Sequence, residues 1–304
     1  MMSKPRILLT GANGFVGRQL VACLPDSVEL HCVSQSPQVA ICGGVTWHAV
    51  DLLDDTACAK LISSVRPSHL AHLAWSAEHG KFWTAPDNIQ WRDAGIALIR
   101  AFGQVGGKRL LICGTGAEYA SSALSPLVEN VSALEPETLY GQTKNALRIA
   151  VHQMADEYGV SYAWARIFNV YGAGEDSRRL VPSIIGALLR DETAKCSSGR
   201  QIRNFIDVRD LGAALAVLLQ SDLCGPINLG SGQEATVGKI AETIGRLMNK
   251  AGLIALGALP DRVGEPLVQV PELKRMRDEL GFVPQIGLEQ GLRDAIISWK
   301  GKAF

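Results

Sequence analysis

The chain lacks paired cysteine motifs, an excess of charge of either sign and long apolar runs, and each absence excludes a class of protein. Its seven cysteines are scattered with no CxxC pair, which argues against a metal site or a disulfide framework and predicts reduced thiols in a cytoplasmic protein. Thirty basic and thirty acidic residues give zero net charge, so nothing indicates a nucleic-acid or membrane partner. No apolar run approaches the roughly 18 residues of a membrane span, and Met1–Pro5 shows no secretory hydrophobic stretch.

The apolar content, 47% of 304 residues, is ample for one large or two moderate domains. Short apolar runs alternate with helix-length segments over the first two-thirds of the chain. This pattern predicts a parallel sheet covered by helices on both faces, in the doubly wound arrangement of a Rossmann-type α/β fold. The expected strands are Arg6–Thr10, Val28–Val33, Val45–Val50, His69–Leu73, Arg109–Cys113 and Ser161–Arg166, and the main helices are Asp54–Val65, Ile89–Gln104 and Pro136–Tyr158.

The pattern of predicted elements changes after Asn169–Gly172, where short helical segments alternate with Gly- and Pro-rich loops. We expect a smaller, interleaved α/β substrate domain there, with one return of the chain to the large sheet. The dinucleotide-binding domain would comprise about 1–168 and 205–230, and the substrate domain about 169–204 and 231–304.

A GxxGxxG pattern directly follows the first expected strand and opens a helix. Glycines allow a tight turn and close approach of the backbone to a pyrophosphate, which the helix N-terminus then holds. Because the pattern has this strand–turn–helix context, we predict a dinucleotide site rather than a plain helix-packing turn. The expected contacts in this turn are Gly11, Asn13, Gly14, Phe15, Val16 and Gly17.

The second strand ends in Ser34 and Gln35, where an acidic residue would bind the adenosine ribose and favour NAD. Since both side chains can donate to a 2′-phosphate, NADP(H) is favoured here and NAD(H) is the alternative. Asp51, after the third strand, is placed to meet the adenine together with Leu52, although an Asp at this place is also a common helix cap.

Tyr140 and Lys144 are four residues apart, and therefore lie on one face of the Pro136–Tyr158 helix. A phenol titrates near about 10 and is a poor base at neutral pH, but a nearby ammonium favours the phenolate. A hydroxyl that holds the substrate oxygen is offered by Thr115, which follows a strand at the edge of the sheet where ligands bind. These three residues predict proton transfer coupled to hydride transfer, rather than a solvated surface pair.

Together these motifs resemble the extended short-chain dehydrogenases/reductases of the nucleotide-sugar epimerase/dehydratase family, over nearly the whole chain. The resemblance implies that Tyr140 is the catalytic acid/base, that Lys144 holds the nicotinamide ribose and lowers the pKa of the phenol, and that Thr115 polarises the sugar oxygen. It also implies that Leu73, Ala74 and Asn88 line the cofactor pocket, and that the enzyme is a homodimer.

The same resemblance assigns substrate contacts. Asn169 would meet the sugar-nucleotide diphosphate, and Arg203 and Arg262 would bind it through guanidinium forks, against the alternative of structural ion pairs. Asn204 departs from the Asp usual in the family. The loop after the fourth strand would face the substrate, and Arg178–Arg179 border either the nucleotide base or only a helix start. The remaining substrate candidates are Ser76, Glu78, His79, Arg179 and Leu180.

The residues after Thr115 bear on the reaction. Dehydratases of the family place Asp-Glu there, whereas this chain has Gly116 and Ala117, with Glu118 one step later, which disfavours dehydration. We expect NADPH-dependent reduction of a nucleotide-linked 4-keto-6-deoxyhexose, because the acidic residue near Ser34 is missing and Ser197–Val208 resembles CDP-abequose-synthase-like 4-ketoreductases. The alternatives are an NAD-dependent 4-epimerase and a non-catalytic NADP-binding sensor.

Overall fold

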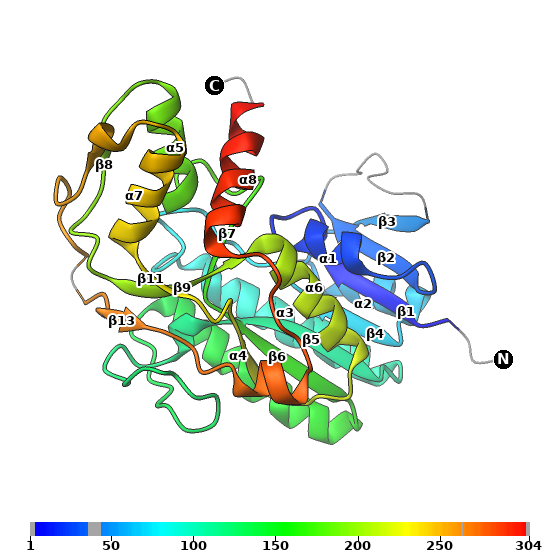
Figure 1. The fold of residues 1–304 in the computed structure, drawn as a ribbon. Coiled ribbons are helices and arrows are strands. Elements are labelled where there is room, and N and C mark those ends of the chain that lie inside the picture. The colour runs from blue at the N-terminus through cyan, green and yellow to red at the C-terminus, as the bar shows by residue number, and fades with distance from the viewer. Residues whose placement is uncertain (1–3, 36–43, 263, 302–304) are drawn as a thin grey trace.

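The structure is a computed structural model that describes residues 4–35, 44–262 and 264–301. A large sheet with helices on both faces forms one part of the molecule, and a small sheet with its own helices packs beside it (Figure 1). Residues 1–3 at the N-terminus and Cys42, one of the seven cysteines, lie outside the described residues.

The large sheet has seven strands, all parallel, in the order β10-β6-β5-β4-β1-β2-β3. From β1 the chain first adds strands on one side of the sheet and then, from β4 onward, on the other side. The boundary between β1 and β4 is therefore a topological switch point, and ligands bind at the carboxyl ends of strands at such a point. Pairing of Thr10 with both Val33 and His72 fixes the register there. The strands are β1 Arg6–Thr10, β2 Glu29–Ser34, β3 Val45–Ala49, β4 His69–His72, β5 Arg109–Thr115, β6 Ser161–Ile167 and β10 Gly225–Leu229.

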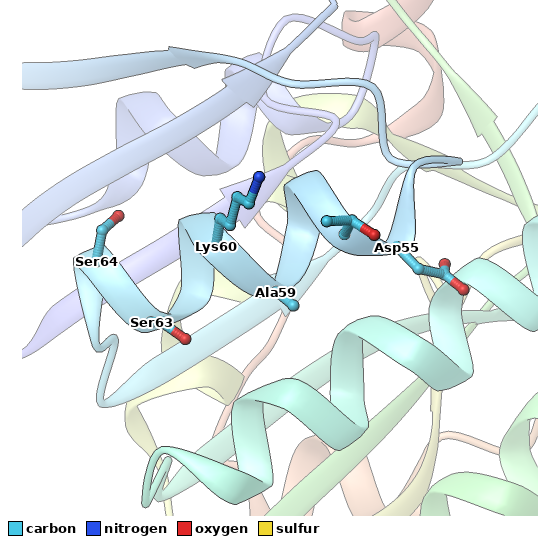
Figure 2. Close-up of a pocket in the computed structure, with 6 residues that line it drawn as sticks. Asp55, Ala59, Lys60, Ser63 and Ser64 are labelled. Atoms are coloured by element: carbon cyan, nitrogen blue, oxygen red, sulfur yellow. The ribbon is translucent and has the colours of Figure 1, made fainter.

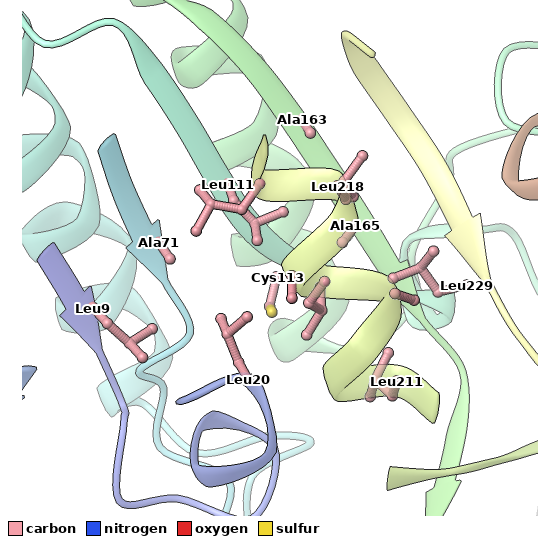
Figure 3. Packing of buried hydrophobic residues seen from close by; sticks show 14 of the residues in the cluster. Leu9, Leu20, Ala71, Leu111, Cys113, Ala163, Ala165, Leu211, Leu218 and Leu229 are labelled. Atoms are coloured by element: carbon pink, nitrogen blue, oxygen red, sulfur yellow. The ribbon is translucent and has the colours of Figure 1, made fainter. Parts of the chain in front are cut away.

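Two helices cover one face of this sheet and three cover the other, so the central strands are largely apolar and buried, whereas the edge strand β3 is partly exposed. The first face carries α1 (Gly17–Cys23) and α6 (Val208–Gln220), and the second α2 (Asp55–Val65), α3 (Asp87–Gln104) and α4 (Leu139–Tyr158). Figure 3 shows the first layer, with Leu9, Leu111 and Ala165 directed from three strands toward Leu20 and Leu218 on the helices.

The small sheet has the order β11-β9-β13, and β7 also pairs with β9. Its strands are β7 Asn169–Tyr171, β9 Ile202–Asp207, β11 Glu234–Thr236 and β13 Val268–Gln269. A separate core joins its helices, α5 Leu180–Leu189, α7 Val237–Leu247 and α8 Leu288–Lys300. A short pair links β8 (Ala194–Lys195) and β12 (Ile254–Ala255), and single turns η1, η2 and η3 occupy Gly116–Glu118, Ala251–Leu253 and Arg275–Glu279.

The predicted Rossmann-type fold is confirmed, with strand ends within one or two residues of expectation. The return to the large sheet comes through α6 and β10, whereas Phe205 lies on β9 of the small sheet. Met276 and Leu280, in the segment expected to be substrate domain, pack into the core of the large sheet. The exact domain boundaries stay a prediction. None of the helices in the described residues is long and apolar enough to cross a bilayer.

Candidate active site

The glycine-rich turn after β1 brings backbone very close to the loop after β4. Gly11 has a φ of +74°, and a Cβ on it would lie 2.8 Å from the backbone nitrogen of Ala74. A Cβ on Gly17 would lie 2.0 Å from the carbonyl oxygen of Gly11, so this position also excludes a side chain. The turn thus needs glycine for its geometry, and α1 begins within it at Gly17, as a pyrophosphate site requires. Phe15, Val16 and Gly14 complete the turn, and the Phe15 ring lies under the Arg18 guanidinium.

A cavity of about 250 Å³ lies beside this turn, at the carboxyl ends of β1 and β2. It contains six of the residues expected to bind the cofactor, together with three that sequence reasoning missed: Val33, Val50 and Trp91. The two valines end strands that were expected, and Trp91 lies three residues after Asn88 on α3, so a helical neighbour of that residue was the available signal. The expected residues are Gly11, Asn13, Ser34, Gln35, Leu52 and Ala74.

None of the described residues that line the cavity is charged, and the Asp51 carboxylate is hydrogen-bonded to one of them, Gln35. The amide of Asn13 donates to Oγ of Ser34 over 3.2 Å, and Nε2 of Gln35 donates to Oδ1 of Asp51 over 3.3 Å. The same Oδ1 accepts the backbone N–H of Leu53, so Asp51 caps its turn as well as facing the rim. Leu73, also expected in the cofactor pocket, is half-buried and packs against the core of the large sheet. The polar side chains that line the cavity, Asn13, Ser34 and Gln35, can exchange hydrogen bonds with the hydroxyls of an adenosine ribose.

Thr115 and Tyr140 meet at the end of β5. The Thr115 hydroxyl donates to the phenol oxygen, which lowers the pKa of Tyr140, but burial outweighs this effect and raises that pKa to about 12. Thr115 Oγ1 also accepts the N–H of Ala117, which fixes its rotamer. This net shift is opposite to the lowering expected from Lys144, whose ammonium lies 6.0 Å from the centre of the Tyr140 ring.

Lys144 is buried one helical turn after Tyr140 on α4. Its Nζ donates to the carbonyl oxygen of Cys113 over 3.0 Å and lies 3.7 Å from the centre of the Trp75 indole. Burial lowers the pKa of Lys144 to about 8. The nearby Cys113 thiol is buried with a pKa raised to about 12, so it is inert packing as expected.

Glu118 is fully buried. Its carboxylate accepts from Nε of Arg166 over 2.8 Å, from the indole N–H of Trp164 and from the backbone N–H of Thr115. Because Thr115 caps η1 from the other side, the two residues form a capping box. The displaced carboxylate therefore holds the Thr115 peptide in place and is not available to remove water from a sugar.

The segment 75–86 between β4 and α3 covers Tyr140 with aromatic rings. Phe82, Trp83 and Trp75 all contact the phenol edge to face, at centroid distances of 5.0, 5.9 and 6.3 Å. Asn88, expected in the cofactor pocket, is fully buried: its amide accepts from Trp75 Nε1 and donates to the carbonyl oxygens of Phe82 and Ala85. In this arrangement Asn88 supports the segment, and a cofactor contact by its amide stays a prediction.

Cationic side chains gather at the mouth of the site. The His79 imidazole faces Arg179, Asp176 and Arg262, and its pKa is lowered first by burial and then by these guanidinium groups. Arg178 pairs with Asp176 over 2.7 Å and with Glu78 over 3.6 Å, which joins segment 75–86 to the loop after β7. The Arg179 guanidinium lies 5.9 Å over the Phe82 ring, and Arg179 makes no side-chain cap for α5.

The other predicted substrate residues have varied surroundings. Arg203 is buried, with its guanidinium bound to Glu265 over 2.8 Å and to carbonyl oxygens on β9 and near β13. A diphosphate would have to replace these contacts, so the predicted fork stays a prediction. Asn204, which stands where the family usually has Asp, makes a local structural contact: its Oδ1 atom accepts the backbone N–H of Ser231. Exposed Arg262 and half-buried Ser76, Asn169 and Leu180 complete the set.

A surface depression of about 710 Å³ lies elsewhere and is shallow. It runs along the outer side of α2, where Asp55, Lys60, Ser63 and Ser64 project from a single helix without converging (Figure 2). No group of three or more His, Cys, Asp or Glu side chains that could hold a metal occurs in the parts of the chain that the structure describes.

Curated relatives match nearly the whole chain at low identity. UDP-glucuronic acid decarboxylase 1 of Xenopus tropicalis is 26% identical over 305 residues, covering 96% of this chain and 72% of the relative. UDP-glucuronic acid decarboxylase 5 of Arabidopsis thaliana is 25% identical over 303 residues, covering 95% and 88%.

Solved structures share the fold. UDP-N-acetylglucosamine 4-epimerase from Methanobrevibacter ruminantium, in complex with UDP-N-acetylmuramic acid, superposes with a TM-score of 0.88 at 22% identity over 99% of both chains. UDP-glucose 4-epimerase of Thermus thermophilus, in complex with NAD, has a TM-score of 0.85 at 22% identity over 98% and 100%. The NAD dependent epimerase/dehydratase family model matches residues 7–230, which include the glycine turn, Thr115, Tyr140 and Lys144, and the chain belongs to this family.

Proposed function

We propose that the protein is an NAD-dependent 4-epimerase of a nucleotide-linked sugar. The observation that carries this proposal is the meeting of Thr115, Tyr140 and Lys144 at the end of β5, next to a glycine turn and a neutral ribose cavity. This arrangement suits oxidation of a sugar hydroxyl followed by reduction of the ketone from the other face.

The chain's own residues account for the proton in both half-reactions. Oxidation of the C–OH group gives a ketone, a hydride and a proton, and bound NAD⁺ would supply hydride acceptance and return. Tyr140 takes the proton from the hydroxyl and later returns it to the ketone oxygen. Thr115 holds the same oxygen through its hydroxyl, and the Lys144 ammonium favours the phenolate form of Tyr140 that accepts the proton during oxidation and forms again when the proton is returned. The aromatic rings of segment 75–86 exclude water around the phenol.

NAD is proposed instead of the NADP expected from the sequence. A 2′-phosphate needs a cation, and the described residues that line the ribose cavity carry none. Residues 36–43, which continue the loop after Gln35, contain no Lys or Arg in their sequence. The Asp51 carboxylate at the rim would repel a phosphate, whereas it and Gln35 can accept and donate hydrogen bonds with ribose hydroxyls.

An epimerase is favoured over the reductase that the sequence suggested. The expectation of a reductase rested on the use of NADPH. The cavity has no cationic lining residue for a 2′-phosphate among the described residues and has the Asp51 carboxylate beside it, so the main argument for NADPH is lost. Curated relatives that match the chain are named as UDP-sugar decarboxylases, and structural neighbours as UDP-sugar 4-epimerases, which makes a UDP-linked sugar the substrate class to test first. The guanidinium groups at the mouth suit a diphosphate. A homodimer remains the expected assembly.

The test begins with the cofactor that co-purifies, identified by mass spectrometry after the protein is denatured. The protein is then incubated with UDP-glucose, UDP-N-acetylglucosamine or UDP-glucuronic acid, and products are followed by NMR, with Tyr140→Phe as the inactive control. Interconversion of 4-epimers without net change in NADH supports the proposal. Stoichiometric oxidation of NADPH by a nucleotide 4-keto-sugar, or release of CO₂ from UDP-glucuronic acid, overturns it.

A further inference from the structure

Trp75 contacts both catalytic side chains and is itself held firmly. Its ring centre lies 3.7 Å from Nζ of Lys144, and its edge-to-face contact with Tyr140 has a centroid distance of 6.3 Å and an interplanar angle of 76°. Its indole N–H donates to Oδ1 of Asn88 over 2.8 Å, and Asn88 is anchored to two backbone carbonyls. The ring position is therefore fixed by a hydrogen bond as well as by packing.

Lys144 has few other partners for its charge. Its ammonium donates to one carbonyl oxygen, that of Cys113 on β5. The ionisable groups around it are the Cys113 thiol on β5, the distant carboxylate of Glu118 on η1, the His72 imidazole on β4 and the Tyr140 phenol on α4. Glu118 is already neutralised by Arg166. Among the described residues no carboxylate lies within salt-bridge distance of Lys144, so the carbonyl oxygen of Cys113 and the face of the Trp75 indole are the groups in direct contact that offset the desolvation of its ammonium.

We propose that Trp75 is a positioning residue that keeps Lys144 in the ammonium form and aimed at the catalytic phenol, with Asn88 holding the indole at the required distance. The face of an indole carries partial negative charge, and it attracts a cation most strongly when both are removed from water. This inference concerns Lys144 directly, so it stands whether or not the proposed epimerase activity is correct.

The experiment measures protonation of Lys144 by NMR in protein labelled with lysine carrying ¹³C at the ε-carbon. The Lys144 resonance is assigned by its loss in Lys144→Arg, and its pH titration is compared between wild type, Trp75→Phe and Trp75→Leu. Loss of the ring should reduce the ratio of ammonium to amine about tenfold at a given pH in Trp75→Leu, with Trp75→Phe between it and wild type. Trp83→Leu is the matched control, because Trp83 contacts Tyr140 but not the ammonium.

The same titration can overturn the proposal. Equal titration midpoints in wild type, Trp75→Phe and Trp75→Leu, or a midpoint raised by either substitution, would show that Trp75 only packs. An equal change in Trp83→Leu would show a general effect of loosening the segment, which also contradicts the proposal. If Trp75→Leu fails to fold, as judged by circular dichroism, the comparison of wild type with Trp75→Phe decides alone. In that case a midpoint unchanged in Trp75→Phe counts against the role.

Discussion

The Glu118 carboxylate and the Arg166 guanidinium lie 2.8 Å apart with both side chains fully buried. The pair stands between the large sheet and the segment after β5, since Arg166 also donates to the Tyr119 hydroxyl and to the carbonyl oxygen of Glu129. Glu118 in turn accepts the N–H of Thr115. Stability and the placement of Thr115, whose hydroxyl we propose to hold the substrate oxygen, therefore depend on the same buried ion pair.

Glu118→Gln leaves the buried guanidinium without its counter-charge. Breaking one side of a buried pair costs about 3–5 kcal/mol, so the variant should lose that much unfolding free energy in urea titrations. Glu279→Gln is the control, since Glu279 pairs with Arg275 at the surface and should change stability by less than about 1 kcal/mol. Equal losses in both variants would contradict a special contribution from the buried pair.

Tyr140→Phe removes the group that moves the proton but keeps the ring among its aromatic neighbours. We expect turnover to fall by about 10²–10⁴, with the dissociation constant of NAD within a few-fold of wild type. Steady-state kinetics and a cofactor fluorescence titration measure the two quantities. A variant that keeps more than a tenth of wild-type turnover would rule out Tyr140 as the acid/base.

Glu175→Gln tests a buried carboxyl in the loop after β7. Burial raises the pKa of Glu175 from 4.5 to about 8, so the folded protein retains a proton that the unfolded chain loses between these values. Stability of the wild type should therefore fall as pH rises through that window, with a slope of up to about 1.4 kcal/mol per pH unit from this group. The substitution should flatten that slope in denaturant titrations at pH 5, 6, 7 and 8.

The matched control for that experiment is Glu192→Gln, which removes an exposed carboxylate paired with Arg190. Its stability should depend on pH as the wild type does. If Glu175→Gln leaves the slope unchanged while Glu192→Gln alters it, the buried group is not the source of the pH dependence.

Gln35→Arg introduces a cation at the rim of the ribose cavity. A guanidinium can form charge-assisted hydrogen bonds with a 2′-phosphate, so the affinity for NADP should rise about tenfold relative to that for NAD. Isothermal titration with each cofactor gives the ratio, and Gln35→Leu serves as the control without charge. Tight NADP binding by the wild-type protein would contradict the proposed preference for NAD.

The sequence was sufficient for the elements that depend on local patterns. Apolar strand runs predicted the large sheet, and the position of Gly11–Gly17 after β1 predicted a turn that admits no side chain at two glycines. Helical spacing also placed Tyr140 and Lys144 on one face of α4. These features follow from periodicity and backbone conformation, which a single sequence carries.

Contacts between segments that are distant in the chain could not be predicted from the sequence. The engagement of Arg203 with Glu265 and of Glu118 with Arg166 joins residues 62 and 48 positions apart, and neither spacing has a local signature. The same holds for Trp75 over Lys144, because the side chain that compensates a buried charge is determined by the tertiary fold. The proposed preference for NAD also rests on such a contact, because the tertiary fold brings the Asp51 carboxylate against Gln35.

The ion pair between Glu78 and Arg178 makes the entrance to the candidate active site sensitive to salt concentration. Both side chains are about half exposed, and together they tie two segments from different parts of the chain. Dissolved ions screen such exposed charges, over a Debye length of about 10 Å at 0.1 M. Rising ionic strength should therefore loosen the tie and speed the passage of small molecules to and from the buried phenol, while leaving the protected hydrogen bonds around Thr115 unaffected.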